Sequence, residues 1–378
     1  MSEAYTFDHT LDKPLPEDAP TRMLAPRQSA YTDPERLQAE INYIFEKDWV
    51  MVGRVGQVPN PGDYITALVG RKPIFVIRQK DGTLRAMANF CLHRYAKLLK
   101  GSGNRKRISC PYHSWTYEIG GALIGVTDKT GFDKADITGR ALETLACETY
   151  LGFIFVSLKH DLPPLSKRLG ELSKAIENFD LDDYEDRHVV EEDVWVGNWK
   201  LLIENFIESY HTTYTHVDSI GPTNPTKLAE FGPRDFEGFS IHSNSYRPED
   251  FPEIHNEKLT NAERRKFYVI SAYPNGLIAL DPNFVWWMAL EPLSTDTSNA
   301  KWGLSFSKHA MEKMEDPDAY VAEIIRVIEV AISEDKEMVE RVQEGCAFAT
   351  DEPGLLHSPL EIPLKEFTNY VEKAISRK

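Results

Sequence analysis

The sequence predicts an α+β fold in which an all-β module is inserted into a larger domain of helices and antiparallel strands. Residues 49–155 consist of short β-branched and aromatic runs separated by Gly, Pro and Asp, which is typical of a compact all-β module. One helical segment precedes this module, and helical segments and strand-like runs follow it. At 378 residues the chain is long enough for two domains.

The N-terminal elements lead into this module. Residues 1–30 are rich in Pro and polar residues and are expected to form an extended arm. Asp33 and Pro34 predict the start of a helix that runs to about Lys47, because Asp is a favoured N-cap and Pro a favoured first helical residue. The expected domains are an N-terminal arm and helix that belong to the catalytic domain (1–47), the β-module (48–156) and the catalytic domain itself (157–378).

The second half mixes helices and strands. Residues 165–179 and the segment 195–210 are predicted to contain helices. A long amphipathic helix from Asp316 to Gly345 is predicted after a set of strands. The expected strands are 267–273, 277–280, 284–290 and 302–306.

Composition excludes several classes of partner. The formal charge of −16 argues against nucleic acid or an anionic membrane. No run approaches the roughly 18 apolar residues of a membrane span, and residues 1–4 lack the basic region of a secretory signal. The cytoplasm is therefore the expected location. Four cysteines suggest ligands or free thiols rather than disulfides, and Cys147 and Cys346, which have no motif partner, are expected to be spectators.

Two Cys–His pairs lie within the β-module. Cys91 and His93 form the first, and Cys110 and His113 form the second. Zinc fingers typically group Cys with Cys and His with His, whereas each short segment here supplies one of each. A [2Fe–2S] cluster with two thiolates on one iron and two imidazoles on the other needs this supply. We therefore expect such a cluster, with zinc as the alternative.

The spacing of these pairs carries a specific resemblance. The pattern C-x-H, then sixteen residues, then C-x2-H continues as Ser114-Trp115-Thr116-Tyr117 with Gly120-Gly121 close behind. It resembles the Rieske domain of the ring-hydroxylating oxygenase family. The resemblance covers nearly the whole chain, because the second half carries that family's other motif. It implies a Rieske [2Fe–2S] domain inserted in a helix-grip (START-like) catalytic domain with an antiparallel sheet.

The other motif contains two histidines, His211 and His216, five residues apart. Mononuclear non-heme iron that binds O₂ takes two His and one carboxylate on one face. On a regular helix, residues five apart point about 140° away from each other, so both could bind one metal only where the helix ends or is distorted. Alone, such a pair would be interpreted as ordinary helix surface or core. The family pattern, N-W-K and then an acid three residues before the first His, matches at Asn198–Lys200 and Glu208, so an iron site is expected.

Asp335 is the expected third iron ligand. It falls near the middle of an apolar stripe on the closing helix, where a carboxylate is costly unless it is paired or binds a metal. The family also places its iron carboxylate in a Glu-Asp pair of this helix; a buried salt bridge is the alternative. Glu334, Glu337 and Glu344 are expected on the solvated face. The stripe consists of Val321, Ile324, Ile325, Ile328, Ile332, Met338, Val339 and Val342.

Glu208 departs from the family pattern, in which most relatives have Asp at this place. The resemblance implies catalytic roles for Asn205 and Glu208, with Glu208 bridging an iron histidine of one subunit and a Rieske histidine of the next. Glu here resembles the branch of carnitine, glycine betaine and proline betaine oxygenases. Aromatic residues on the expected strands could form a cage for such cations, although aromatics on strands are also ordinary core. They are Tyr273, Phe284, Trp286 and Trp287.

The resemblance implies a terminal oxygenase with a Rieske cluster, a mononuclear Fe(II) and O₂ as co-substrate. The sequence contains neither a Gly-rich dinucleotide fingerprint nor a second iron–sulfur cysteine set. Electrons are therefore expected from a separate NAD(P)H-dependent flavin or iron–sulfur reductase, and a homotrimer is expected from the family. The expected reaction is hydroxylation of a quaternary ammonium compound, with N-demethylation or C–N cleavage. The alternatives are ring hydroxylation of an aromatic acid and a Rieske electron carrier without catalysis.

Overall fold

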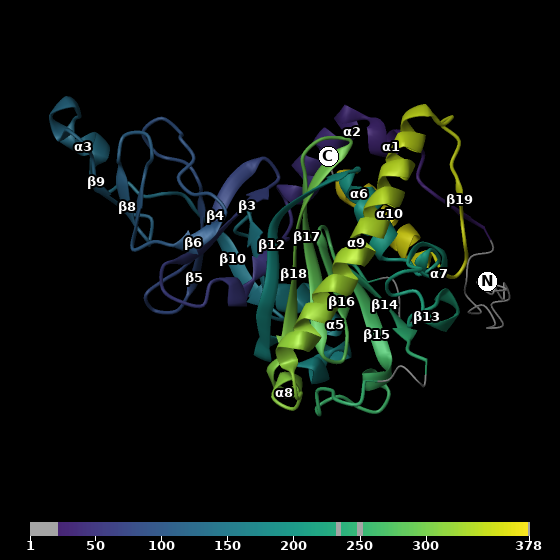
Figure 1. The fold of residues 1–378 in the computed structure, drawn as a ribbon. Coiled ribbons are helices and arrows are strands. Elements are labelled where there is room, and N and C mark those ends of the chain that lie inside the picture. Colours follow the sequence, from purple (N-terminus) through teal and green to yellow (C-terminus); the bar gives the residue numbers. More distant parts are fainter. Residues whose placement is uncertain (1–21, 232–235, 248–251, 377–378) are drawn as a thin grey trace.

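Two seven-stranded antiparallel sheets form the framework of the molecule and confirm the predicted α+β fold. The computed structural model describes residues 22–231, 236–247 and 252–376 (Figure 1). Most of the predicted N-terminal arm, residues 1–21, lies outside the described residues. Among the residues that are described, no helix is long and apolar enough to cross a membrane.

The first sheet belongs to the β-module and has the strand order β2-β11-β10-β5-β4-β3-β6. A smaller sheet, β7-β8-β9, lies at the end of the module that is farthest from the second sheet, near the short helix α3 (Lys134–Ile137) (Figure 1). The strands are β2 (Val50–Arg54), β3 (Asp63–Val69), β4 (Lys72–Arg78), β5 (Leu84–Ala88), β6 (Ser102–Asn104), β7 (Arg107–Ser109), β8 (Thr116–Glu118), β9 (Leu123–Gly125), β10 (Thr144–Tyr150) and β11 (Phe153–Ser157).

The second sheet has the order β12-β18-β17-β16-β15-β14-β13. It includes all four strands predicted in this half, while β12, β13 and β14 were not predicted. The domain limits at residues 47 and 156 stay a prediction. The strands are β12 (Tyr184–Val196), β13 (Ala229–Phe231), β14 (Phe239–Ser245), β15 (Lys266–Ala272), β16 (Gly276–Leu280), β17 (Phe284–Pro292) and β18 (Thr297–Ser307); a short pair, β1 (Met23–Leu24) and β19 (Leu355–Leu356), lies outside both sheets.

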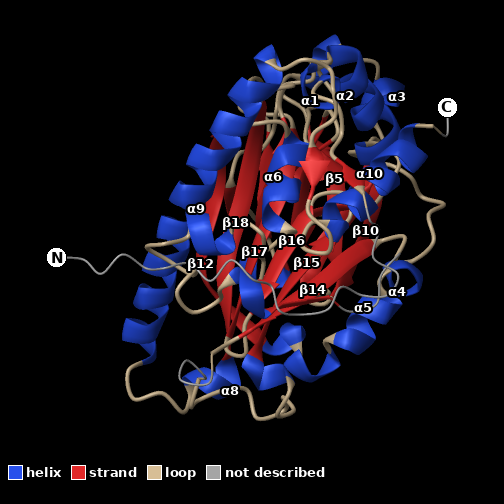
Figure 2. Cartoon of the chain, turned by 90° about the vertical axis from the view of Figure 1, so that its right-hand side faces the viewer, coloured by secondary structure: helices blue, strands red, loops and turns tan. Residues whose placement is uncertain are grey.

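Helices cover both faces of the second sheet (Figure 2). The long helix α9 (Pro317–Phe348), with α6 and α10, packs on one face, and α4 and α5 pack on the other. The predicted closing helix corresponds to α9, but α10 follows it and was not predicted. The other helices are α1 (Ser29–Thr32), α2 (Pro34–Glu40), α3 (Lys134–Ile137), α4 (Leu165–Arg168), α5 (Gly170–Ala175), α6 (Trp199–Phe206), α7 (Thr212–Thr215), α8 (Lys308–Met311) and α10 (Ile362–Ile375).

The predicted N-terminal helix begins as expected. The Asp33 side chain accepts a hydrogen bond from the backbone N–H of Glu35 at 2.8 Å, and Pro34 is the first residue of α2. The helix then continues as a π-helical turn over Ile41–Phe45. The N-cap and proline signals therefore located the start correctly.

Buried polar contacts join the β-module to the second sheet. Arg54 on β2 pairs with Asp186 on β12 at 3.0 Å, and both side chains are buried. Arg54 also donates to the carbonyl of Leu181 at 2.8 Å. Because breaking such a pair would leave a buried charge, it restricts the orientation of the module on the catalytic sheet.

Candidate metal centres

The four predicted cluster ligands lie on two loops of the β-module that have the same backbone pattern. Cys91 follows β5, and Cys110 follows β7. In each loop the cysteine N–H donates to the carbonyl five residues later, and the cysteine carbonyl accepts from the N–H four residues later. The fourth residues, Tyr95 and Ser114, have positive φ angles of 60° and 56°. This left-handed conformation is usually a glycine position, so sequence reasoning did not locate these turns.

The side chains of the two loops converge. Cys91 and Cys110 are 1% and 3% exposed, and the rings of His93 and His113 lie 4.7 Å apart between centroids. Nδ1 of His93 is buried without a hydrogen-bond partner. Burial raises the pKa of the Cys91 thiol, so an iron ion would have to displace its proton. Two buried thiols and two adjacent imidazoles, one with an unpartnered nitrogen, fit a Rieske-type [2Fe–2S] cluster.

Aromatic residues pack around this donor set. Trp115 stacks on His93 with 4.9 Å between centroids and an interplanar angle of 9°. The Tyr117 hydroxyl lies 3.3 Å from Sγ of Cys91. Tyr95 and Tyr112, by contrast, are 77% and 58% exposed. The two cysteines are thus buried among aromatic residues, while two exposed tyrosines lie on the same loops as the histidines.

A second donor set lies beside the short helix α7. Helix α6 ends at Phe206, so α7 is a separate helix. His211 is the N-cap residue of α7, and His216 is its C-cap residue. Nε2 of His211 lies 3.1 Å from Nε2 of His216, and Oδ1 of Asp335 lies 3.5 and 3.3 Å from these two nitrogens. With metal–ligand bonds of about 2.1 Å, ligands at right angles would lie about 3 Å apart. The three donors therefore fit a facial triad around one metal ion.

Electrostatics favour a cation among these donors. Burial lowers the pKa of His211, but the Glu208 carboxylate and Asp335 outweigh it and raise that pKa to about 10. Burial also disfavours the charged form of Asp335, which by itself raises the pKa of this carboxyl. The two histidines outweigh burial and hold that pKa well below its usual range. His211 thus retains its proton more readily than a free histidine, because the carboxylates of Glu208 and Asp335 lie beside it. A divalent metal ion could replace this proton.

Helix α9 brings Asp335 to this point from a distant part of the chain. The Asp335 side chain is 14% exposed, and its Oδ1 accepts from Nδ2 of Asn205 on α6 at 2.8 Å. The predicted stripe is wrong at Val342, which is 50% exposed. Gln343 is buried instead, because the backbone N–H of Asn198 requires an acceptor there and donates to its side chain at 2.8 Å.

Each histidine of this donor set has a carboxylate next to Nδ1, the ring nitrogen that is not part of the donor set. Nδ1 of His211 contacts Oε1 of Glu208, and Nδ1 of His216 lies 2.9 Å from Oε2 of Glu334. If each Nδ1 carries the proton and donates it, each Nε2 is left free to bind a metal. Both carboxylates therefore orient candidate ligands from the side away from the donor set.

These carboxylates correct two expectations. Glu334 does not lie on a solvated face: it also accepts from the backbone N–H of Asp218 at 3.2 Å and from the Ser219 hydroxyl, because the loop after α7 packs there. Glu208 lies within the segment 195–210, in which a helix was expected, but α6 ends at Phe206 and does not include it. Its carboxylate instead accepts from the backbone N–H of His211 at 3.2 Å across a turn.

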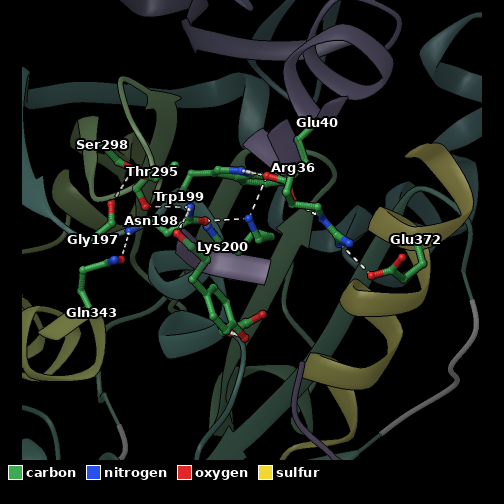
Figure 3. A network of polar contacts seen from close by, with 12 residues as sticks. Arg36, Glu40, Gly197, Asn198, Trp199, Lys200, Thr295, Ser298, Gln343 and Glu372 are labelled. Atoms are coloured by element: carbon green, nitrogen blue, oxygen red, sulfur yellow. Dashed lines mark hydrogen bonds and ion pairs between the residues drawn. The ribbon is translucent and has the colours of Figure 1, made fainter. Parts of the chain in front are cut away.

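The N-W-K motif anchors the start of α6 (Figure 3). Asn198 is the N-cap and accepts from the Lys200 backbone N–H at 3.2 Å. The Lys200 ammonium and Nε1 of Trp199 each donate to Glu40 of α2 at 2.8 Å. All four side chains are buried. Together with the Gln343 contact, they tie α6 to α2 and α9, so the helices that carry Asn205 and Asp335 are held together.

A cavity of about 70 Å³ extends from the His–His–Asp set. By the rule that one water needs roughly 10–15 Å³, it would hold several waters or part of a small molecule. Phe206, Phe267 and Trp286 provide aromatic walls, and the rings of Phe206 and Trp286 lie 5.1 Å apart. Glu208 and Asp335 also line it. The lining combines aromatic surface with negative charge.

The predicted aromatic cage is mostly wrong. Trp286 lines the cavity, but Trp287 faces the other side of the sheet and packs against Phe153 at 6.5 Å, because successive strand residues point to opposite faces. Tyr273 stacks on Tyr370 of α10 at 4.8 Å. Phe284 is also absent from the lining and packs near Phe306, at 5.9 Å between ring centroids.

Sequence reasoning missed two of the aromatic walls. Phe206 directly precedes the ligand loop, and Phe267 lies on β15, two residues from Val269 on the same face. The motif around His211 and His216 was a usable signal for Phe206. Nothing local distinguished Phe267 from an ordinary strand residue.

Two family profiles match the chain. The Rieske [2Fe-2S] domain matches residues 48–136, and the ring hydroxylating alpha subunit (catalytic domain) matches residues 181–377. A crystal structure of the quaternary ammonium Rieske monooxygenase CntA has a similar fold, with a TM-score of 0.80 and 23% identity, over 96% of this chain and 99% of that one.

Curated relatives include oxygenases of two substrate types. The chain is 34% identical over 231 residues to toluate 1,2-dioxygenase subunit alpha of Pseudomonas putida (59% of this chain, 51% of that protein). It is 35% identical over 221 residues to the glycine betaine monooxygenase oxygenase subunit of Chromohalobacter salexigens (55% and 48%). It is 26% identical over 326 residues to the carnitine monooxygenase oxygenase subunit of Acinetobacter pittii (83% and 83%). The chain thus spans about half the length of the first two and most of the third.

Proposed function

The chain belongs to the family of ring-hydroxylating alpha subunits with a Rieske domain, and from this premise we propose that it is a terminal oxygenase acting on a small quaternary ammonium compound. Cys91, His93, Cys110 and His113 would hold the [2Fe–2S] cluster. His211, His216 and Asp335 would hold the mononuclear iron. When bound, the two groups would supply electron transfer and O₂ activation.

The protein side of the mechanism rests on orientation. Asn205 donates to Asp335, while Glu208 and Glu334 orient the two histidines. The charges of Asp335, Glu208 and Glu334 would stabilise a metal ion at the end of the cavity, and aromatic side chains line the cavity beside it. A substrate in the cavity would therefore be held beside the reactive centre rather than in solvent.

The lining of the cavity carries the proposal for the substrate class. It contains two carboxylates, and among the described residues no Lys or Arg lines it. A quaternary ammonium group has no N–H to donate, so it is recognised by aromatic faces and by negative charge. Trp286, Phe206 and Phe267 supply the faces, and Glu208, which is not one of the proposed iron ligands, supplies the charge. The names of two of the relatives are consistent with this substrate class.

An aromatic acid is the second candidate substrate. Its support is the likeness to toluate 1,2-dioxygenase together with the apolar, aromatic character of the cavity. A flat ring could stack between Phe206 and Trp286. This candidate gives the negative charge of Glu208 no role in binding the substrate, and for that reason we place it second.

A substrate panel tests the proposal. The protein loaded with iron and cluster would be mixed with NADH, a reductase and O₂, and with trimethylammonium compounds or aromatic acids. The expected result is a demethylated or cleaved amine, detected by mass, with NADH consumed in proportion. Turnover of aromatic acids alone would contradict the ammonium proposal and support the second candidate.

We also propose that electrons pass between copies of the chain in a homotrimer. The cluster loops and α7 lie toward opposite ends of the molecule (Figure 1). Tyr95 and Tyr112 are exposed beside the cluster ligands, and Tyr210 and Tyr214, 44% and 50% exposed, flank the iron motif. Glu208 would then accept a further hydrogen bond, from a Rieske histidine of the neighbouring copy. A fully active monomer in sedimentation experiments would contradict this arrangement.

A further inference from the structure

One side of the cavity is formed by aligned rows of residues on the second sheet. In one row, His242, Val269, Ala279 and Trp286 are paired across β14 to β17. The next row on the same face pairs Asn244 with Phe267. Because residues paired across strands share a face, these side chains form one wall. Burial lowers the pKa of His242 to about 3, so this part of the wall is uncharged.

Most polar groups near this wall have partners. The Ser209 hydroxyl bonds with Nε2 of His242 at 2.9 Å and donates to Oδ1 of Asn244 at 3.1 Å. Asn205 donates to Asp335, and the carboxylate of Glu208 accepts from His211. These groups therefore make their hydrogen bonds with each other and with the candidate metal ligands.

One donor is an exception. Nε1 of Trp286 is buried without a hydrogen-bond partner, although this residue lines the cavity. Trp286 is 7% exposed. The neighbouring Asn224 side chain is not available in the same way, because its carbonyl oxygen accepts from the Thr223 hydroxyl at 3.0 Å and its amide interacts with the Tyr246 hydroxyl. Native proteins rarely leave buried donors unpaired, so such donors beside a cavity indicate a missing acceptor.

We propose that Trp286 binds an oxygen acceptor of the substrate and so makes the enzyme selective for bifunctional molecules. This inference rests on the proposed function and deepens it. The oxidised end of the substrate would lie at the His–His–Asp set, and its oxygen would accept from Nε1 of Trp286. Because no Lys or Arg of the described chain lines the cavity, the oxygen is held by a neutral donor. Betaines, which combine an ammonium group with a carboxylate, have this chemistry.

Trp287 provides a matched comparison. Its Nε1 is also buried without a partner, but its ring packs on the opposite face of the sheet, away from the cavity. Trp286→Phe and Trp287→Phe therefore delete the same atom group on neighbouring residues. Only the first deletion removes a donor that a substrate could reach.

The test is calorimetric titration of two ligand pairs into the iron-loaded protein. In each pair one member carries an oxygen acceptor and the other lacks it: glycine betaine with tetramethylammonium, and benzoate with toluene. Trp286→Phe should weaken binding of the oxygen-bearing member of the pair that the cavity accepts by about ten-fold, the loss expected for one hydrogen bond to a charged group. Trp287→Phe should leave both pairs within about two-fold of the parent.

The outcomes separate this inference from the proposed function. A Trp286-dependent preference for benzoate over toluene, without binding of either ammonium compound, would keep the acceptor site and reject the ammonium substrate. Equal losses for both members of a pair in Trp286→Phe would overturn the acceptor site. It would also be overturned if neither oxygen-bearing ligand bound the parent more tightly than its partner.

Discussion

The two candidate metal centres of this chain are built in opposite ways. The cluster donors, from Cys91 to His113, come from two loops of one small module, with the same backbone hydrogen bonds in both loops. The iron donors come from the ends of a one-turn helix and from the middle of α9, far along the chain. The first site depends on local loop structure. The second exists only when α6, α7 and α9 are packed together.

Their surroundings differ as well. Exposed tyrosines lie beside the cluster loops, whereas the iron donors lie at the end of a cavity under α9. The iron site is also supported by Asn205, Glu208 and Glu334. The comparison indicates that the cluster can survive changes in the catalytic half, while the iron is sensitive to contacts from several elements.

Removing a ligand from either centre should empty that centre and leave the other intact, which is the largest effect expected. The parent protein should hold about three irons per chain, two in the cluster and one mononuclear. Asp335→Ala should lose the mononuclear iron and all product but keep the Rieske electron-paramagnetic signal. Cys91→Ala or His113→Ala should abolish that signal. Zinc without acid-labile sulfide in the parent would contradict the assignment of the cluster.

Substitution of Glu208 should slow electron transfer between the two centres without removing the cluster or the mononuclear iron. Glu208→Gln removes the charge beside His211, and we expect both metals to remain while reoxidation of the pre-reduced cluster slows by about 100-fold. Glu208→Asp should be milder, because it keeps the charge and shortens the reach by one methylene. The measurement is single-turnover oxidation on adding O₂ and substrate. Reoxidation at the parent rate, with product formed, would rule out the bridge.

Substitution of Glu334 tests whether this carboxylate supports the iron site without any effect on the cluster. Glu334→Gln should lower iron affinity by about 10-fold, because His216 loses its charged hydrogen-bond acceptor. The Rieske signal should not change. Glu337→Gln is the matched control on the same helix, since Glu337 is exposed and pairs with Arg341. Equal iron affinity in both variants, measured by chelator competition, would show that Glu334 does not support the ligand.

The smallest effect expected is a pH dependence of the unfolding free energy that arises from a residue of the catalytic half. Burial raises the pKa of Glu204 on α6 to about 7, although a hydrogen bond from Tyr31 and the charge of Lys200 oppose the rise. The folded chain therefore binds a proton that the unfolded chain releases between roughly pH 4.5 and 7. Its stability should fall as the pH rises through this window, and the Glu204 contribution should be lost above it.

Glu204→Gln should remove this dependence, because an amide resembles the protonated carboxyl. The unfolding free energy of Glu204→Gln relative to the parent should rise by about 1 kcal/mol between pH 6 and pH 8. Urea unfolding followed by tryptophan fluorescence measures it, and cluster absorbance follows the Rieske module. A constant difference at the two pH values would show that Glu204 is already ionised at pH 6.

Local sequence determined the elements that carry their own signals. The Asp33 cap, the strands from β15 to β18 and the helix α9 were predicted because capping chemistry, β-branched runs and helical periodicity act within a few residues. The Cys–His spacing and the histidine motif indicated the two donor sets for the same reason. By contrast, β12 is rich in charged residues and was missed, because its strand structure depends on pairing with β18.

Only the tertiary structure decided which side chains meet. The sequence placed Asp335 on the inner face of a helix, but packing of α9 against α6 and α7 aligned it with His211 and His216, turned Glu334 toward His216 and left Val342 exposed. Trp286 and Trp287 are neighbours with the same chemistry, yet the pleat directs only Trp286 into the cavity. Composition and spacing are properties of the chain, whereas the direction of a side chain is set by what packs against its element.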